Sequence, residues 1–237
     1  MTVPLDADRI SAVVAATVER VYAAVADLRA AALSALGAGP EVHADAADLE
    51  QRARALLTAP GQLAVGLGLV AAPRPDRDVR LLWWQADPAG GRLAALRPDL
   101  RPASLGFYDY TATEWFDLPR RTGRRHVVGP YVDVHGTGRY LLTLTAPVLA
   151  GGEFLGVVGA DVPVNRFESQ LLPALGPCAS AVVVLNGEDR VVLSTSPRWV
   201  VGDLLAAPPV GSAAPVEVLG VPWRVYLPSV EPGLLPT

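Results

Sequence analysis

The sequence lacks lysine and has a single cysteine. All twenty basic residues are arginine, so a lysine Schiff base and lysine-dependent phosphate chemistry are excluded. Cys178 alone forms neither a disulfide within the chain nor a cysteine-based zinc site. It precedes an apolar run, and we expect it to be a small core residue.

The chain also lacks a net positive charge and any apolar run of membrane-spanning length. Its formal net charge is -4, which argues against a nucleic-acid partner. No segment reaches the roughly 18 uncharged apolar residues needed to cross a bilayer. The first residues, Met1 to Asp6, do not form a basic region followed by an apolar one, as a signal peptide would.

Motifs typical of enzymes are missing as well. The sequence contains no nucleophile elbow, P-loop or dinucleotide fingerprint. His126, Asp133 and His135 lie close together, but the usual metal-ligand spacings are absent and four arginines precede His126 within residues 120–125. We therefore expect no catalytic residues, no cofactor and no metal site.

A long amphipathic helix is predicted at the start of the chain. Over residues 8–36 the apolar positions recur at three- and four-residue steps, and Gly37 and Pro40 end the pattern. Such a helix is either a spine or dimer interface, or simply a long packing helix. A second helix is predicted over 45–57.

Strands and turns dominate the remainder, which has the composition of a globular protein (51% hydrophobic, 19% charged). Thr111 and Glu114 form a capping-box pattern that predicts a helix over 111–117, and Pro130 predicts an edge strand or a bulge. A helix is predicted over 165–175. The strands are predicted at 63–70, 79–85, 92–96, 127–134, 139–148 and 154–162, followed by hairpins over 181–194 and 215–226. The pattern indicates an α+β fold with antiparallel sheets.

Aromatic and acidic residues concentrate between residues 107 and 162. Acidic groups and aromatic rings gathered in one stretch are groups that could bind a small molecule, preferably a cation. Read alone, the rings are equally ordinary core residues, Asp161 a strand-end cap and Asp133 a turn residue. Trp83 and Trp84 lie on opposite faces of one strand, so only one faces the interior of this region; we favour Trp84.

Several blocks in this region, in their order and spacing, resemble the double Cache domain, the ligand-binding module of many bacterial sensor proteins. They are Trp115-Phe116, Gly129-Pro130-Tyr131-Val132-Asp133, Thr145-Ala146-Pro147-Val148, Gly152, and Gly156-Val157-Val158-Gly159-Ala160-Asp161. The resemblance implies a long helix (residues 1–40) backing two PAS-like lobes, each with an antiparallel sheet. The first lobe (41–176) would hold the ligand, and the second (177–237) would be smaller.

The resemblance also implies a site. In amino-acid-binding members an arginine two positions before the tryptophan holds the ligand carboxylate, while the Pro-Tyr-x-Asp block and the final Gly-x-Asp hold the amino group. Here that arginine is replaced by Thr113, so the carboxylate of a bound amino acid would be buried without a positively charged partner. The same replacement marks an amine-binding branch, so we expect an amine ligand. The expected binding residues are Trp84, Tyr108, Tyr110, Thr113, Trp115, Phe116, Tyr131, Asp133 and Asp161.

Two alternatives remain. The ligand is instead an amino acid or another carboxylate, held by Arg139 or by an arginine of 120–125; or the pocket is vestigial and the chain is an interaction module. We expect a homodimer through the first helix and a downstream signalling partner that the sequence does not identify. If Met1 is the natural start, we expect a cytoplasmic protein; if the chain is cut from a longer one, an extracytoplasmic sensor domain.

Overall fold

The computed structural model describes residues 6–37, 43–73, 81–86, 93–134, 138–175 and 181–229. Cys178 and His135 lie outside these ranges. The chain divides into two compact units, Arg20–Pro163 and the residues on either side of that segment. The domain boundaries expected after residues 40 and 176 stay predictions.

The first helix is as long as its apolar pattern predicts. Helix α1 spans Ala7–Gly37, and its apolar face is buried at Ile10, Val14, Val18, Val21, Val25 and Leu28. Helix α2 spans His43–Leu57. No helix within the described ranges is both long enough and apolar enough to cross a lipid bilayer.

The larger unit is built on a six-stranded antiparallel sheet in the order β3-β2-β1-β6-β5-β4. Its central strands, β1, β5 and β6, are almost wholly buried. The bounds are β1 Gly66–Ala71, β2 Leu81–Ala86, β3 Leu93–Ala95, β4 His126–Val132, β5 Tyr140–Ala150 and β6 Glu153–Pro163. The predicted hairpin of the two longest strands is confirmed in β5 and β6, which Gly151 and Gly152 join with positive φ angles.

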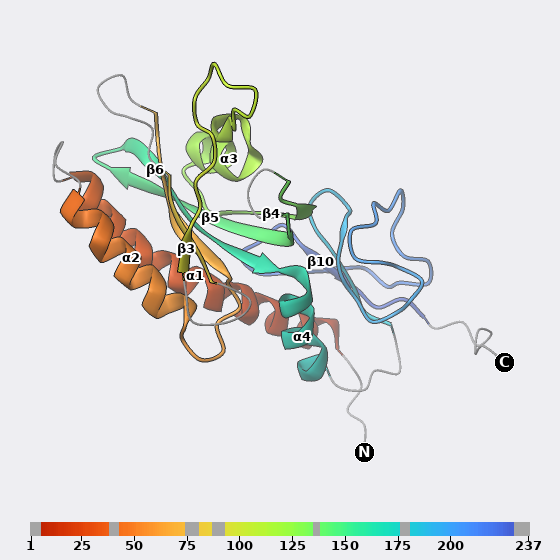
Figure 1. Cartoon of the computed structure of the whole chain (residues 1–237). Helices are drawn as coiled ribbons and strands as arrows, with labels where there is room; N and C mark the ends of the chain where they lie inside the picture. Colours follow the sequence, from red (N-terminus) through yellow and green to blue (C-terminus); the bar gives the residue numbers. More distant parts are fainter. Residues whose placement is uncertain are drawn as a thin grey trace. The chain divides into compact units, whose positions relative to one another are not determined.

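Helices cover both faces of this sheet (Figure 1). Helix α2 packs on β1 and β2, while α3 (Glu114–Thr122) packs on β4, β5 and β6 from the opposite face. Beneath α3 lies an apolar cluster of buried side chains: Val70, Trp83, Tyr110, Trp115, Phe116 and Val157.

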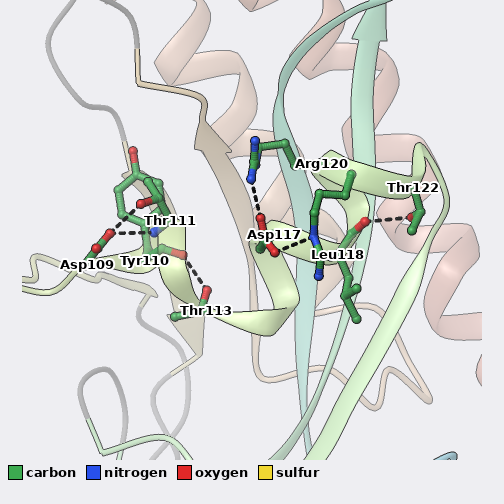
Figure 2. Close-up of polar contacts among 9 residues, drawn as sticks. Asp109, Tyr110, Thr111, Thr113, Asp117, Leu118, Arg120 and Thr122 are labelled. Carbon is green, nitrogen blue, oxygen red and sulfur yellow. Dashed lines mark hydrogen bonds and ion pairs between the residues drawn. The ribbon is translucent and has the colours of Figure 1, made fainter.

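The α3 segment begins later than the capping-box pattern predicts. A 3-10 turn, η1 (Tyr110–Ala112), comes first, and the backbone N–H of Thr111 donates to Asp109 (Figure 2). Helix α3 starts at Glu114, with Thr113 at its N-cap position. The prediction of Thr111 as N-cap is therefore wrong, because the Asp109 side chain takes the first N–H and closes a separate turn.

Strand β4 is an edge strand with a bulge, as Pro130 predicts. Val128 pairs with Thr143 and Tyr131 with Leu141, so two residues of β4 face one residue of β5 between these pairs. Gly129 sits in the bulge at a φ of 112°, where a Cβ would meet the Leu141 carbonyl. Because of the extra residue, Tyr131 and Val128 share a face of the sheet although they are three positions apart.

The smaller unit holds a four-stranded antiparallel sheet in the order β8-β7-β10-β9. Its strands are β7 Val183–Leu185, β8 Val191–Ser194, β9 Val216–Glu217 and β10 Arg224–Tyr226, which confirms both predicted hairpins. Helix α4 (Val164–Leu175) belongs to this unit and packs Phe167 edge-on against Trp223. The architecture is the α+β arrangement expected from the sequence: a long helix and two antiparallel sheets.

Candidate functional site

A small cavity lies on the α3-covered face of the six-stranded sheet. Its volume is about 30 Å³, room for about one water molecule, so a larger ligand fits only if lining side chains shift. The lining residues come from β1, β2, β4, β5 and β6, from α3, and from the loops after β3 and β4: Val70, Leu81, Trp83, Leu96, Tyr108, Trp115, Tyr131, Asp133, Thr143 and Asp161.

Strand pairing brings the polar lining residues together. Asp161 of β6 pairs in register with Thr143 of β5 and with Gly66 of β1, so these three positions share the cavity face. The bulge turns Tyr131 to the same face. Four strands therefore converge on one carboxylate.

Asp161 is held by two neutral donors. Its Oδ2 accepts from the Trp83 indole N–H at 3.0 Å, and its Oδ1 accepts from the Thr143 hydroxyl at 2.8 Å. The Tyr131 hydroxyl lies 2.9 Å from Thr143 Oγ1 and, since that threonine donates to Asp161, donates to it in turn. The result is a hydrogen-bonded chain that ends on a buried carboxylate, to which no basic side chain of the described residues is hydrogen-bonded.

Burial raises the pKa of Asp161 from 3.8 to about 7. The nearby charge of Asp133 adds to this increase in pKa, whereas the hydrogen bonds from Thr143 and Trp83 and the charge of Arg139 oppose it. A carboxyl group of this kind is only partly ionised near neutral pH in the empty protein. A cation placed beside it would restore its charge.

A row of glycines lets Trp83 reach Asp161 from two strands away. A Cβ on Gly66 would lie 2.8 Å from both Asp161 Oδ2 and Trp83 Nε1, and one on Gly68 would lie 2.8 Å from Trp83 Cε3. On the neighbouring strand, a Cβ on Gly159 would lie 3.2 Å from Trp83 Cη2. The indole therefore lies across bare backbone, which explains glycine in the middle of two buried strands.

Trp83, not Trp84, faces the cavity. Trp84 is buried too, but it pairs with Leu67 and points to the other face of the sheet, where α2 packs. Trp83 and Trp84 lie on opposite faces of the sheet, as predicted, but the favoured residue, Trp84, is not the one that faces the cavity. The glycines opposite Trp83 decide the phase, because only that face has space for an indole lying flat.

The glycine row yields a testable expectation. Gly66→Ala should lower the free energy of unfolding by about 1–3 kcal/mol, since its methyl group must displace the Trp83–Asp161 hydrogen bond. Chemical denaturation monitored by tryptophan fluorescence measures this effect. Gly106→Ala is the matched control, because its Cβ would meet only ordinary contacts beyond 3.6 Å, and it should change stability little. Equal stability of the two variants would contradict the packing described here.

Aromatic and acidic side chains complete the wall. The Trp115 indole is hydrogen-bonded to the Tyr108 hydroxyl, and burial together with the charge of Asp133 raises the pKa of Tyr108 to about 12. Burial and the charge of Asp161 likewise raise the pKa of Tyr131. Both phenols are therefore neutral at physiological pH. The cavity thus combines two carboxyl groups, two phenols and two indoles.

Five of the nine predicted binding residues line this cavity: Tyr108, Trp115, Tyr131, Asp133 and Asp161. Tyr110 and Phe116 instead form the aromatic layer behind Trp115, with ring centroids 6.4 and 6.0 Å from its own. The Tyr110 hydroxyl donates to the Ala71 carbonyl, and the Thr113 hydroxyl donates to the Tyr110 carbonyl (Figure 2). Tyr110, Thr113 and Phe116, like Trp84, do not line the cavity. The hydroxyl groups of Tyr110 and Thr113 donate to backbone carbonyls, and the rings of Phe116 and Trp84 are packed in the core.

Sequence reasoning missed Trp83, Thr143 and the apolar wall of Val70, Leu81 and Leu96. A signal for Trp83 was present: Gly66 and Gly68 alternate within a strand, which marks a close approach by another group. Thr143 carried no local signal, since a threonine in a buried strand is common and its role follows only from its register with Asp161.

Comparison with known proteins supports the fold. No family model and no curated protein matches the sequence, but solved structures match it over nearly its whole length. A methyl-accepting chemotaxis protein X superposes with a TM-score of 0.66 at 17% identity, covering 92% of each chain. The extracellular domain of the putative histidine kinase soHK1S-Z6 gives 0.61 at 16%, covering 92% of this chain and 89% of that one.

A third structure is the ligand-binding domain of the Pseudomonas aeruginosa PAO1 amino acid chemoreceptor PctC in complex with GABA. Its TM-score is 0.56 at 20% identity, and the match covers 92% of this chain and 94% of that one. The chain has the double Cache fold. The three matched structures come from a chemotaxis protein, a histidine kinase and a chemoreceptor. At these identities the double Cache likeness establishes the fold, and the ligand has to be argued from the cavity.

Proposed function

We propose that this double Cache chain is the ligand-binding module of a sensor and that its cavity binds a small ammonium-bearing molecule. One observation carries the proposal: the Asp161 carboxyl group is buried at the cavity with two neutral hydrogen-bond donors. A purely structural carboxylate so deeply buried would be costly without a cationic partner. A ligand ammonium group supplies that partner.

The rest of the lining suits a cation as well. Asp133 brings a second carboxylate, and the indoles of Trp83 and Trp115 with the phenols of Tyr108 and Tyr131 offer ring faces. A ring face over a desolvated ammonium contributes about 0.5–2 kcal/mol. None of the described lining residues is basic, so the cavity wall itself presents no charge that would repel a cation.

Two ligand classes share this ammonium requirement. A simple amine fits the observation that Thr113 brings neither a positive charge nor its hydroxyl to the cavity. An amino acid is the second candidate, favoured by the complex of PctC with GABA, a molecule with both an ammonium and a carboxylate group. In that case Arg139, whose charge acts on Asp161, is a candidate partner for the ligand carboxylate.

Calorimetric titration with matched pairs separates these classes. The pairs are propylamine and GABA, ethylamine and alanine, and isobutylamine and valine, each differing by one carboxyl group. We expect saturable binding of at least one amine, at least as tight as that of its amino acid, and none of propan-1-ol. Binding of the amino acids without their amines would select the second candidate. Binding of carboxylates that lack an amino group would overturn the ammonium proposal altogether.

Placement outside the cytoplasm is part of the proposal, supported by the likeness to a domain described as extracellular. The homodimer through α1 stays a prediction, and light scattering over a range of protein concentrations tests it.

A further inference from the structure

A second hollow lies along α1 in the larger unit. It is a half-open groove of about 440 Å³ between α1, the start of β4 and β5, and we call it the α1 groove. Its lining residues are Tyr22, Val25, Ala26, Arg29, Leu33, Gly123, Arg125, Ala146, Pro147 and Leu149. It shares no lining residue with the cavity beside Asp161, and its volume lies within the range of about 300–1,000 Å³ typical of small-molecule sites.

We propose that the α1 groove is a second ligand site, which binds an amphipathic organic anion such as a medium-chain carboxylate. The α1 residues of the groove recur at three- and four-residue steps and so form one stripe of the helix. Val25 is buried, but Leu33 remains 36% exposed on α1 and Leu149 42% exposed on β5. Helix α1 and strand β5 therefore leave apolar surface exposed in the groove.

The described lining of the α1 groove carries basic side chains although the chain as a whole carries a net charge of -4. Arg29 is exposed on α1, and Arg125 directly precedes β4, which begins at His126. No acidic residue is among the described lining residues. A carboxylate is the ligand group that such a pair of guanidinium groups recognises best.

Arg125 is positioned in advance. Its guanidinium lies 4.3 Å from the centre of the Tyr22 ring, and the Tyr22 hydroxyl donates to the His126 carbonyl at 2.9 Å. The ring is thereby fixed at both ends, by the helix and by this hydrogen bond. A guanidinium stacked on a ring engages it with its face and donates hydrogen bonds from its edge. The arrangement costs little ordering when an anion binds.

The ligand's apolar part has a matching surface. Val25 and Leu33 on one side and Ala146 and Leu149 on the other leave an apolar wall beside the two arginines. Gly123, at a φ of 65°, adds backbone without a side chain at this rim. An anion with a hydrocarbon chain contacts both the two arginines and the apolar wall, whereas an inorganic anion contacts only the arginines.

Isothermal titration of the whole chain with octanoate tests the proposal, alongside octan-1-ol and octylamine. We expect saturable binding of octanoate only. Arg29→Gln and Arg125→Gln should each weaken it at least tenfold, and the exposed position of Arg29 makes its variant safe for folding. Arg54→Gln on α2, with the same charge change, should have no effect, and neither should Asp161→Asn, which separates this site from the ammonium site.

Three results would overturn the proposal. The first is equal binding of octanoate and octylamine, which would indicate a merely apolar surface. The second is octanoate binding that neither arginine substitution weakens. The third is absence of saturable octanoate binding. If the protein then also self-associates and Arg29→Gln abolishes that self-association, the α1 groove is assigned to a second copy of the chain.

Discussion

Replacing Asp161 by asparagine should abolish binding of ammonium ligands and, at the same time, stabilise the empty protein above neutral pH. The loss of binding, at least a hundredfold, follows from removal of the buried counter-charge. The gain in stability follows from the raised pKa of Asp161, since the native state holds the ionised carboxylate less well than the unfolded chain does. Calorimetric titration and thermal unfolding measure the two effects.

The sign of the stability effect depends on pH. The pKa of this carboxyl is higher in the folded state than in the unfolded one, so the native state binds more protons between about pH 4 and pH 7, and stability falls as the pH rises through that range. Raising the pKa from 3.8 to about 7 corresponds to a cost of about 4 kcal/mol above that range. The asparagine loses part of the hydrogen bonding with Thr143 and Trp83 at every pH, so we expect a net gain of about 1–3 kcal/mol at about pH 8 and a net loss of similar size at about pH 4.

Asp48→Asn is a matched control, because Asp48 is exposed on α2 and the change in net charge is the same. It should alter neither binding nor the pH dependence of stability. A strand-end cap would behave in the opposite way: Asp161→Asn would destabilise the protein at every pH. That outcome would indicate that Asp161 stabilises the fold and is not a counter-charge for a ligand.

Affinity for an ammonium ligand should fall about tenfold for each pH unit below 7 and level off above about pH 8. The ligand binds the ionised form of Asp161, and binding at lower pH must first displace its proton. An alkylammonium group stays charged throughout this range, because its pKa is near 10. Titrations at half-unit steps from about pH 5 to pH 8.5 measure the slope.

The two phenols that line the cavity do not contribute to this pH dependence. The pKa of Tyr108 is raised to about 12 and that of Tyr131 is raised as well, so neither phenol titrates in this range. Calorimetry in two buffers of different ionisation enthalpy should show release of about one proton on binding at about pH 6. Affinity that stays constant from about pH 5 to pH 8 would contradict a role for Asp161 as the counter-charge.

Much of the fold was predictable because it follows from local patterns. The apolar spacing of α1, the glycine turn between β5 and β6, and the two hairpins of the smaller sheet all lie in continuous stretches of sequence. The start of α3 was predicted wrongly because two caps compete there, and the Asp109 side chain takes the N–H group that the capping-box pattern assigned to a longer helix.

The site was only partly predictable because its members meet through strand register. The resemblance to the double Cache family identified Asp133, Tyr131 and Asp161 as candidate binding residues. The alternation of side chains along a strand did not decide between Trp83 and Trp84. Register settles it: Trp83 pairs with Gly68, and Gly68 pairs with Gly159, two residues before Asp161. The bulge at Gly129 and Pro130 likewise changes which side chains of β4 face the cavity, and a sequence pattern with period two cannot anticipate that shift.

The central claim is that an ammonium group sits against Asp161, and a crystal structure of the protein with its tightest amine tests this most directly. The account predicts ligand density in the widened cavity, with the nitrogen within about 3 Å of an Asp161 oxygen and near the faces of Trp115 and Tyr131. Density elsewhere, or a ligand whose carboxylate rather than its nitrogen faces Asp161, would contradict it.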